Sequence, residues 1–415
     1  MTQLEMQGLA AKNASRVLSI AGTAKKNAAL EAIASALEAR REEILAANQE
    51  DMTAAKAAGM RPSLQDRLAL DGSRIAGIVD GVRQVAALPD PIGEITKMST
   101  RPNGLVIGKR RVPLGVIGII YEARPNVTVD AAALCLKSGN AVILRGGKEA
   151  FHSNQAFVSI MRDALESAGL PRDCLALVTD TTRQSATELM NLTEYLDVLI
   201  PRGGAGLIKN VVEHAKVPVI QTGVGVCHVY VHGEADLDMA ARIIHNAKTS
   251  RPSVCNAAEC LLVDRAVARD FLPMAWQLLQ TKNVELRGCP ETRAILGDFV
   301  VPASEEDWDT EFGDYILAVK VVGGFDEAVE FIHAHGTGHS EAIVTNNYFA
   351  AQQFLDQVDA AAVYVNASTR FTDGNEFGLG AEIGISTQKM HARGPMGLEE
   401  LTSSKFVIYG TGQIR

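Results

Sequence analysis

Between residues 114 and 221, short apolar segments alternate with stretches of helical periodicity, and this alternation constrains the fold more than any other feature of the chain. The expected strands are 114–120, 141–145, 174–178, 196–200 and 217–221, and the expected helices lie near 127–138, 151–168, 182–192 and 205–214. Strands separated by helices pair in parallel, and the helices cover both faces of the sheet. Such sheets bind ligands at the carboxyl ends of their strands, so functional residues are expected there.

A second α/β series follows the first. Its expected strands are 226–231, 260–263, 315–322, 342–345 and 361–365, and its expected helices lie near 236–248, 265–281, 325–334 and 347–358. Residues 8–58 have helical periodicity, residues 104–120 are predicted to form a hairpin across Lys109-Arg110-Arg111, and an apolar strand is expected at 406–409. The two series predict an α/β protein with two main domains.

Composition excludes several classes of protein. A chain of 415 residues, 47% of them hydrophobic, can bury a large core, so disordered and fibrous classes are excluded. No run of eighteen apolar residues predicts a membrane span, and we expect no secretory signal in the first fifteen residues. A net charge of −9 argues against a dedicated nucleic-acid binder. The six cysteines include no C-x-x-C pair, which favours reduced thiols in a cytoplasmic protein.

Two glycine-containing loops follow expected strands and are suited to phosphate groups, although both G-x-G-x-x-G and the P-loop motif are absent. The first is Arg145-Gly146-Gly147-Lys148-Glu149, which offers two cations and a backbone that can approach an anion closely. The second contains Gly203 and Gly204 and opens a helix, where N–H groups can bind a pyrophosphate. Each loop has an alternative structural explanation, a tight turn for the first and close strand–helix packing for the second.

Cys255 is the candidate nucleophile. It lies in a predicted loop before the strand 260–263, and loops carry reactive groups more often than strands do. Arg251 is close in sequence and would favour the thiolate. Cys260, inside the strand, is interpreted as a core residue. A group at His333, His335, His339 and Glu341 has metal-ligand residue types, but glycines interrupt it and we expect no metal there.

Several motifs taken together, in their order along the chain, resemble the aldehyde dehydrogenase superfamily over nearly the full length. They are LGVIGIIYEARPNVTVD at 114–130, SGNAVILRGGK at 138–148, PRGGAGL at 201–207, VGVCHVYV at 224–231, SVCNAAECLLV at 253–263, EFGDY at 311–315 and FGLGAEIGIS at 377–386. The resemblance implies a Rossmann-type cofactor domain, an α/β catalytic domain and a small strand-rich oligomerisation element. The expected boundaries are 1–225 with a hairpin at 100–115, then 226–365, then a return to the first domain and an oligomerisation strand at 366–415.

The resemblance also implies roles for individual residues. It places the family's nucleophile on Cys255 and its oxyanion-binding asparagine on Asn126. Arg145 and Lys148 fall where the family holds the adenosine ribose and its 2′-phosphate, which favours NADPH, and Glu311 falls on the ribose-binding glutamate. Further substrate contacts are expected from Arg124 and Arg370, because a guanidinium binds carboxylate or phosphate in a bidentate manner.

One departure from the family pattern bears on the reaction. The family's glutamate that activates water for thioester hydrolysis is missing, because residues 221–225 read Gln-Thr-Gly-Val-Gly. Without this base, water attack is expected to be slower by about 10²–10⁴-fold. The resemblance, together with the missing base, implies NADPH-dependent reduction of γ-glutamyl phosphate to glutamate 5-semialdehyde, the second step of proline biosynthesis, as the expected activity.

Two alternatives remain open, a hydrolytic aldehyde dehydrogenase and a non-catalytic nucleotide-binding scaffold. A homo-oligomer is expected because the hairpin and the last strand leave sheet edges that a second subunit can cover. A glutamate 5-kinase is a possible further partner, because the acyl phosphate substrate is labile.

Overall fold

The computed structural model describes residues 1–122 and 124–415. These residues divide into two compact units, each described separately below. Unit 1 comprises Met1–Thr222, Gly378–Gly384 and Met396–Arg415, and unit 2 comprises Gly223–Phe377 and Ile385–Pro395. The return to the first unit, expected from residue 366, therefore begins at Gly378, because residues 369–372 form hydrogen bonds with Asn256 of unit 2. Unit 2 begins at Gly223 rather than at residue 226.

Unit 1 contains the parallel sheet expected from the first α/β series. Its strands pair in the order β5-β4-β3-β6, with bounds β3 (Val116–Tyr121), β4 (Ala141–Arg145), β5 (Leu175–Leu177) and β6 (Val198–Arg202). Every residue of β3 is buried, as expected for a strand covered on both faces. Residues 217–221 form only an isolated bridge from Val219 to Leu199 instead of the expected strand, since Pro218 lacks the N–H that a ladder needs.

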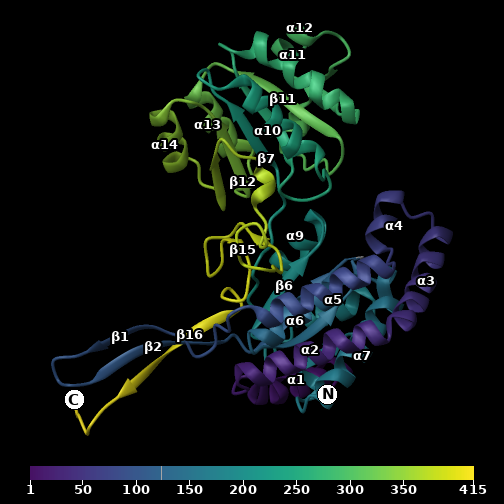
Figure 1. Ribbon diagram of the computed structural model, residues 1–415, viewed down its shortest axis with the longest axis vertical. Coiled ribbons are helices and arrows are strands. Elements are labelled where there is room, and N and C mark those ends of the chain that lie inside the picture. Colours follow the sequence, from purple (N-terminus) through teal and green to yellow (C-terminus); the bar gives the residue numbers. More distant parts are fainter. Residues whose placement is uncertain (123) are drawn as a thin grey trace. The chain divides into compact units, whose positions relative to one another are not determined.

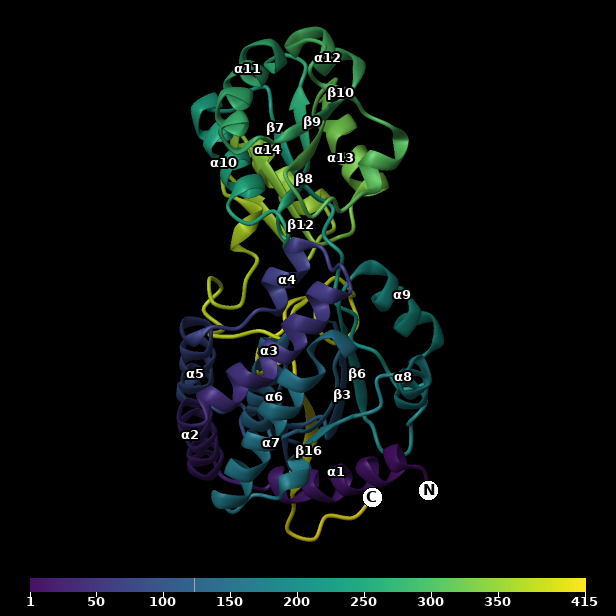
Figure 2. The ribbon, with the colours of Figure 1, turned by 90° about the vertical axis from the view of Figure 1, so that its right-hand side faces the viewer.

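Helices cover both faces of this sheet (Figure 2). The helices of unit 1 are α1 (Gln3–Leu18), α2 (Thr23–Ala39), α3 (Arg41–Ala57), α4 (Pro62–Leu68), α5 (Gly72–Ala87), α6 (Pro125–Lys137), α7 (Phe151–Ser167), α8 (Arg183–Met190) and α9 (Ala205–His214). Apolar residues of α1, α8 and α9 form one core cluster with β3, β4 and β6, whereas α6 and α7 lie on the opposite side.

A separate antiparallel sheet extends from unit 1 as a ribbon (Figure 1). Its order is β1-β2-β16, with bounds β1 (Ile95–Thr100), β2 (Val106–Pro113) and β16 (Thr402–Tyr409). The hairpin predicted at 104–120 is wrong, because residues 109–111 lie within β2 and β3 belongs to the other sheet. The turn lies at 101–105, where Pro102, Asn103 and Gly104 suit a chain reversal, and Gly104 has a φ of 85°.

Unit 2 is a second parallel α/β unit. Its main sheet has the order β10-β9-β11-β8-β7-β12-β13, with bounds β7 (Cys227–Val231), β8 (Ala258–Asp264), β9 (Glu285–Gly288), β10 (Val301–Pro302), β11 (Ile316–Val322), β12 (Ser340–Val344) and β13 (Ala362–Val365). The short strands β9 and β10 lacked a sequence signal. Two further short strands, β14 (Ile385–Ser386) and β15 (Gly394–Pro395), pair with each other.

Helices cover both faces of the unit 2 sheet as well. They are α10 (Leu237–Thr249), α11 (Ala268–Leu279), α12 (Pro290–Leu296), α13 (Phe325–His335) and α14 (Tyr348–Gln357). Phe325 and Phe354 contact the ring of Tyr230 on β7, so α13 and α14 cover that face, whereas α10 and α11 lie on the other. Across the described residues, no helix combines the length and the apolar character that a membrane crossing requires.

Candidate active site

The predicted site residues fall into two groups, one in each unit. Cys255, Arg370 and Glu311 belong to unit 2, whereas Arg124, Asn126, Arg145, Lys148, Gly203 and Gly204 belong to unit 1. Each group is described within its own unit.

Cys255 lies in a turn between α10 and β8, here called the Cys255 loop (residues 252–257). It is half-buried, whereas the other cysteines in the described part of the chain are buried. Burial raises the pKa of the Cys135, Cys174 and Cys227 thiols, so these are poorer nucleophiles. The loop precedes β8, so Cys255 lies at the amino end of its strand and not at the carboxyl end.

Segments distant in sequence hold the Cys255 loop in place. The thiol of Cys227 on β7 donates a hydrogen bond to the carbonyl oxygen of Cys255 at 3.2 Å. The hydroxyl of Thr369 donates to the carbonyl oxygen of Asn256 at 2.7 Å, and the Asn256 amide donates to the carbonyl oxygen of Thr372 at 3.0 Å. These contacts fix the backbone at Cys255 and at the residue that follows it.

Gly225 packs directly against this loop. A Cβ atom placed on Gly225 would lie 1.5 Å from the carbonyl oxygen of Cys255, so the position admits no side chain. Thr222, which ends the adjoining segment of unit 1, is buried there and donates its hydroxyl to the carbonyl oxygen of Pro201 at 2.8 Å. Glycine at 225 is therefore required for space, and this position offers no carboxylate that could activate water.

Arg370 lies beside the nucleophile. Its guanidinium donates from Nε to the hydroxyl of Ser250 at 3.0 Å and from Nη1 to the side-chain oxygen of Asn256. Burial and then the like charge of Arg251 lower the pKa of Arg370, and the charge of Cys255 acts in the opposite direction. Arg370 thus brings a guanidinium to the loop that carries the cysteine, and a guanidinium there suits an anionic substrate.

Glu311 lies in the segment 310–315, here called the Glu311 loop, between η4 (Glu305–Asp309) and β11. Its Oε1 accepts a hydrogen bond from the N–H of Gly225 at 3.2 Å. Glu311 and the Cys255 loop therefore contact the same glycine from two directions. Sequence reasoning had assigned both residues but had no signal for the glycine that joins them.

In unit 1, Arg145 ends β4 and donates through Nη2 to the carbonyl oxygens of Thr181 and Thr182, at 2.8 and 2.9 Å. Its Nε atom is buried and has no hydrogen-bond partner in the described part of the chain. Lys148, which begins η1 (Lys148–Ala150), is exposed. A Cβ atom on Gly146 would lie 2.2 Å from the Asn154 amide nitrogen, so this backbone is held close to α7. One buried unpaired donor and one exposed cation after the same strand fit an anionic nucleotide group.

The loop after β6 has an internal partner that the sequence did not reveal. Glu122, directly after β3, accepts a hydrogen bond from the N–H of Gly204 at 3.0 Å. A Cβ atom on Gly203 would lie 2.7 Å from the Glu122 carboxyl carbon. The N-terminus of α9 therefore carries a carboxylate at the position expected for a pyrophosphate. The position of Glu122 directly after an expected strand was the sequence signal that could have indicated this contact.

Asn126 is exposed and lies in the first turn of α6, after Arg124, which is half-buried and precedes the helix. The Asn126 amide donates to the Asp130 carboxylate at 3.0 Å. Burial raises the pKa of Asp130 to about 6, against the lowering effects of Asn126 and Arg202. Glu122 and Asn126 thus belong to the same end of the sheet as Arg145, as parallel pairing of β3, β4 and β6 requires.

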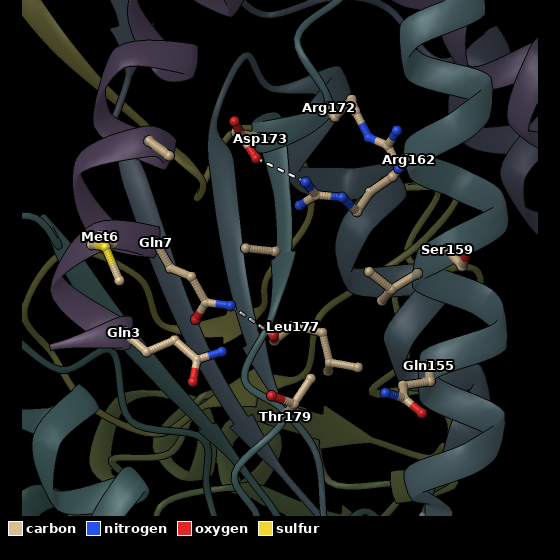
Figure 3. Close-up of a pocket in the computed structure, with 13 residues that line it drawn as sticks. Gln3, Met6, Gln7, Gln155, Ser159, Arg162, Arg172, Asp173, Leu177 and Thr179 are labelled. Carbon is tan, nitrogen blue, oxygen red and sulfur yellow. Dashed lines mark hydrogen bonds and ion pairs between the residues drawn. The ribbon is translucent and has the colours of Figure 1, made fainter.

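A cavity of about 500 Å³ lies elsewhere in unit 1, between α1, α7 and β5 (Figure 3). Gln7 donates to the carbonyl oxygen of Leu177, and Arg162 donates to that of Leu175 and pairs with Asp173. These bonds satisfy carbonyl groups on the edge strand. No predicted site residue lines this cavity within the described residues.

Comparison with known proteins finds relatives that match over the whole length of the chain. The family model of the aldehyde dehydrogenase family matches residues 3–293. The gamma-glutamyl phosphate reductase of Halothermothrix orenii is 61% identical over 413 residues, which cover 100% of this chain and 99% of the relative. The crystal structure of gamma-glutamyl phosphate reductase from Thermotoga maritima matches with a TM-score of 0.97 and 51% identity over 100% of both chains. An acetylating aldehyde dehydrogenase from Geobacillus thermoglucosidasius, at 18% identity and a TM-score of 0.69 over 100% of both chains, shares the fold.

Proposed function

The chain belongs to the aldehyde dehydrogenase family, and from this premise we propose that it reduces γ-glutamyl phosphate to glutamate 5-semialdehyde and releases phosphate. This reaction is the second step of proline biosynthesis. The observation that carries the proposal is the half-buried Cys255, which has Arg370 beside its loop and packs against Gly225, a residue with no side chain that could activate water.

The Cys255 thiolate attacks the acyl carbon of the γ-carboxyl phosphate, and the carbon–oxygen bond to phosphate then breaks. Inorganic phosphate leaves, and the substrate remains bound as a thioester on Cys255. When bound, NADPH would supply the hydride for reduction of the thioester carbonyl. The resulting hemithioacetal collapses, which returns the thiolate and releases the semialdehyde.

Positive side chains serve the two anionic ends of the substrate. Arg370, held by Ser250 and Asn256 next to the nucleophile, neutralises either the leaving phosphate or the substrate carboxylate. We assign the other anion to Arg124. Asn126 and backbone N–H groups of the Cys255 loop stabilise the oxyanion that forms during attack, for which the Asn126 amide exchanges its bond to Asp130.

We assign the cofactor contacts to each group separately. Arg145 and Lys148 bind the adenosine ribose and its 2′-phosphate, and the unpaired Nε of Arg145 supports this assignment. Gly203 and Gly204 would hold the pyrophosphate, for which the Gly204 N–H would have to exchange its bond to Glu122, and Glu311 would hold a ribose hydroxyl. Family membership supports a nicotinamide cofactor, and the two cations favour NADPH over NADH.

Exclusion of water distinguishes this reaction from aldehyde oxidation. A hydrolytic enzyme needs a general base beside the thioester, and residue 225 has no side chain to supply one. A reductase gains from the same feature, because hydrolysis would consume its activated substrate. This argues against the hydrolytic alternative.

A non-catalytic scaffold is disfavoured by the partial exposure of Cys255, since structural cysteines are usually buried.

The test is reduction of NADP by glutamate 5-semialdehyde, followed by absorbance at varied phosphate concentration. Phosphate-dependent turnover is expected in the wild-type protein. Cys255→Ala should abolish turnover, while titration of NADPH fluorescence shows retained cofactor binding. Phosphate-independent turnover would favour the hydrolytic alternative, and turnover in the Cys255→Ala variant would exclude the thioester route.

The ribbon sheet supports a homo-oligomer. Phe406, Ile408 and Tyr409 on the edge strand β16 are 70%, 60% and 59% exposed, so a long apolar edge is available for a second copy.

We also propose a cytoplasmic location, because the cysteines in the described part of the chain form no disulfides. Transfer of the labile acyl phosphate from a glutamate 5-kinase remains a further proposal.

A further inference from the structure

A buried ion pair lies next to the Cys255 loop and has no role in the reaction as described above. Lys248 of α10 and Glu259 of β8 form it, with Nζ and Oε2 2.5 Å apart and side chains 0% and 1% exposed. Burial lowers the pKa of Lys248 and raises that of Glu259. Apolar replacements of such pairs are often neutral or stabilising, so folding energy alone does not account for this one.

Both members of the pair contact the Glu311 loop. The second carboxylate oxygen of Glu259 accepts a hydrogen bond from the N–H of Gly313 at 3.1 Å. The Nζ atom of Lys248 lies 6.0 Å from the centroid of the Phe312 ring. The residues from 310 to 313 have no helix or strand of their own, so side-chain contacts hold them, and the pair supplies two of these beside Arg287, which lies 5.1 Å from the centroid of the Phe312 ring.

The contacts close a ring around the nucleophile within unit 2. Glu259 follows Cys255 by four residues along the chain and binds Gly313. Glu311, two residues before Gly313, accepts the N–H of Gly225 at 3.2 Å. Gly225 in turn packs against the carbonyl oxygen of Cys255. A shift of the Glu311 loop therefore changes the position of the Glu311 carboxylate relative to the cysteine.

We propose that Lys248 and Glu259 are positioning residues that set the Glu311 carboxylate, and with it the cofactor ribose, relative to Cys255. The inference rests on the proposed function, in which Glu311 binds the ribose. Neither side chain touches the reacting atoms. Glu259 acts through the Gly313 N–H, and Lys248 acts through Glu259 and the Phe312 ring.

The test replaces the pair by apolar residues, Lys248→Met with Glu259→Leu, in the full-length protein. Three measurements follow, namely NADPH affinity from its fluorescence, hydrogen exchange of the Gly313 amide without cofactor, and thermal stability. We expect NADPH to bind about tenfold more weakly and the Gly313 amide to exchange faster. The control is Lys26→Met with Asp90→Leu, a buried pair of unit 1 with Nζ and Oδ2 2.6 Å apart, for which NADPH affinity should not change.

A double-mutant cycle with Glu311→Gln separates positioning from a merely structural role. Because Glu311 is already misplaced in the apolar variant, removing its charge there should weaken NADPH binding by less than twofold, against about tenfold in the wild type. Wild-type NADPH affinity in the apolar variant, or full additivity with Glu311→Gln, would overturn the inference.

A second variant keeps the inference testable if the apolar double variant does not fold. Glu259→Asp keeps the charge but is one methylene shorter, so it cannot reach Lys248 and Gly313 together. Weaker NADPH binding that is non-additive with Glu311→Gln supports positioning, and unchanged binding refutes it. Failure of the proposed function would be distinguishable from failure of this inference. In that case the wild-type protein itself would show no phosphate-dependent turnover, independently of the NADPH affinities of the variants.

Discussion

Gly225 offers the sharpest test of how the nucleophile is held. In Gly225→Ala the new methyl would lie 1.5 Å from the Cys255 carbonyl oxygen, and its three nearest atoms all belong to the Cys255 backbone. Real contacts of this kind are no closer than about 3 Å, so the Cys255 loop or the 223–226 segment must move by more than 1 Å. A misplacement of 1 Å near a reacting centre costs about 10²-fold in rate.

We therefore expect kcat/KM of the Gly225→Ala variant to fall by about 10²-fold or more. Overpacking should also lower the free energy of unfolding by about 1–3 kcal/mol. The assay is phosphate-dependent NADP reduction, with the iodoacetamide alkylation rate of Cys255 and the thermal midpoint measured on the same preparation. The loss of kcat/KM should be larger than the fraction of unfolded protein at the assay temperature can explain.

The matched control is Gly77→Ala on α5, where a Cβ atom would meet no other atom within 4 Å. Alanine there should leave activity unchanged and stabilise the helix by about 0.5–1 kcal/mol. A Gly225→Ala enzyme with kcat/KM within threefold of wild type would refute the argument that this contact places the sulfur.

Three further predictions concern single side chains. Cys227→Val removes the thiol that donates to the Cys255 carbonyl and should lower kcat by about fivefold, whereas Cys227→Ser, which keeps a donor, should retain most of the rate. Burial raises the pKa of Asp130 to about 6, so the native state binds the proton of this carboxyl group more tightly than the unfolded chain does. The stability that this proton contributes is therefore lost as pH rises from about 4 to 6. Asp130→Asn should flatten this dependence by about 3 kcal/mol, measured by urea unfolding at several pH values. Lys148→Ala should raise KM for NADPH about tenfold and leave KM for NADH unchanged, and equal effects on the two would contradict the 2′-phosphate assignment.

Local patterns were sufficient for part of the fold. Continuous apolar segments such as 116–121 and 141–145 predict buried parallel strands wherever they occur, so the strand cores were located without tertiary information. Patterns failed where the partner of a strand had to be identified. Residues 104–120 contain two strand segments, but each pairs with a different sheet, and their partners at 95–100 and 402–409 are distant or only weakly apolar.

The same limit applies to the candidate site. Cys255 was distinguishable from Cys260 by its position before a strand, and the missing carboxylate at 221–225 was readable directly from the sequence. No local pattern indicated that Glu122 would occupy the Gly204 N–H, or that Asn256 would bind Thr372. These partners are 82 and 116 residues apart, and their meeting depends on the order of strands in a sheet.

The chain's own sequence determined its α/β class, its exposed-loop cysteine and the absence of a water-activating base, because each follows from residue types within one short segment. Tertiary structure alone decided that Gly225 presses on the Cys255 carbonyl, and that Lys248 and Glu259 support the Glu311 loop. These contacts join segments that become neighbours only after β7, β8 and β11 take adjacent places in one sheet. Close packing then fixes their separations to a fraction of an ångström, a precision that periodicity cannot encode.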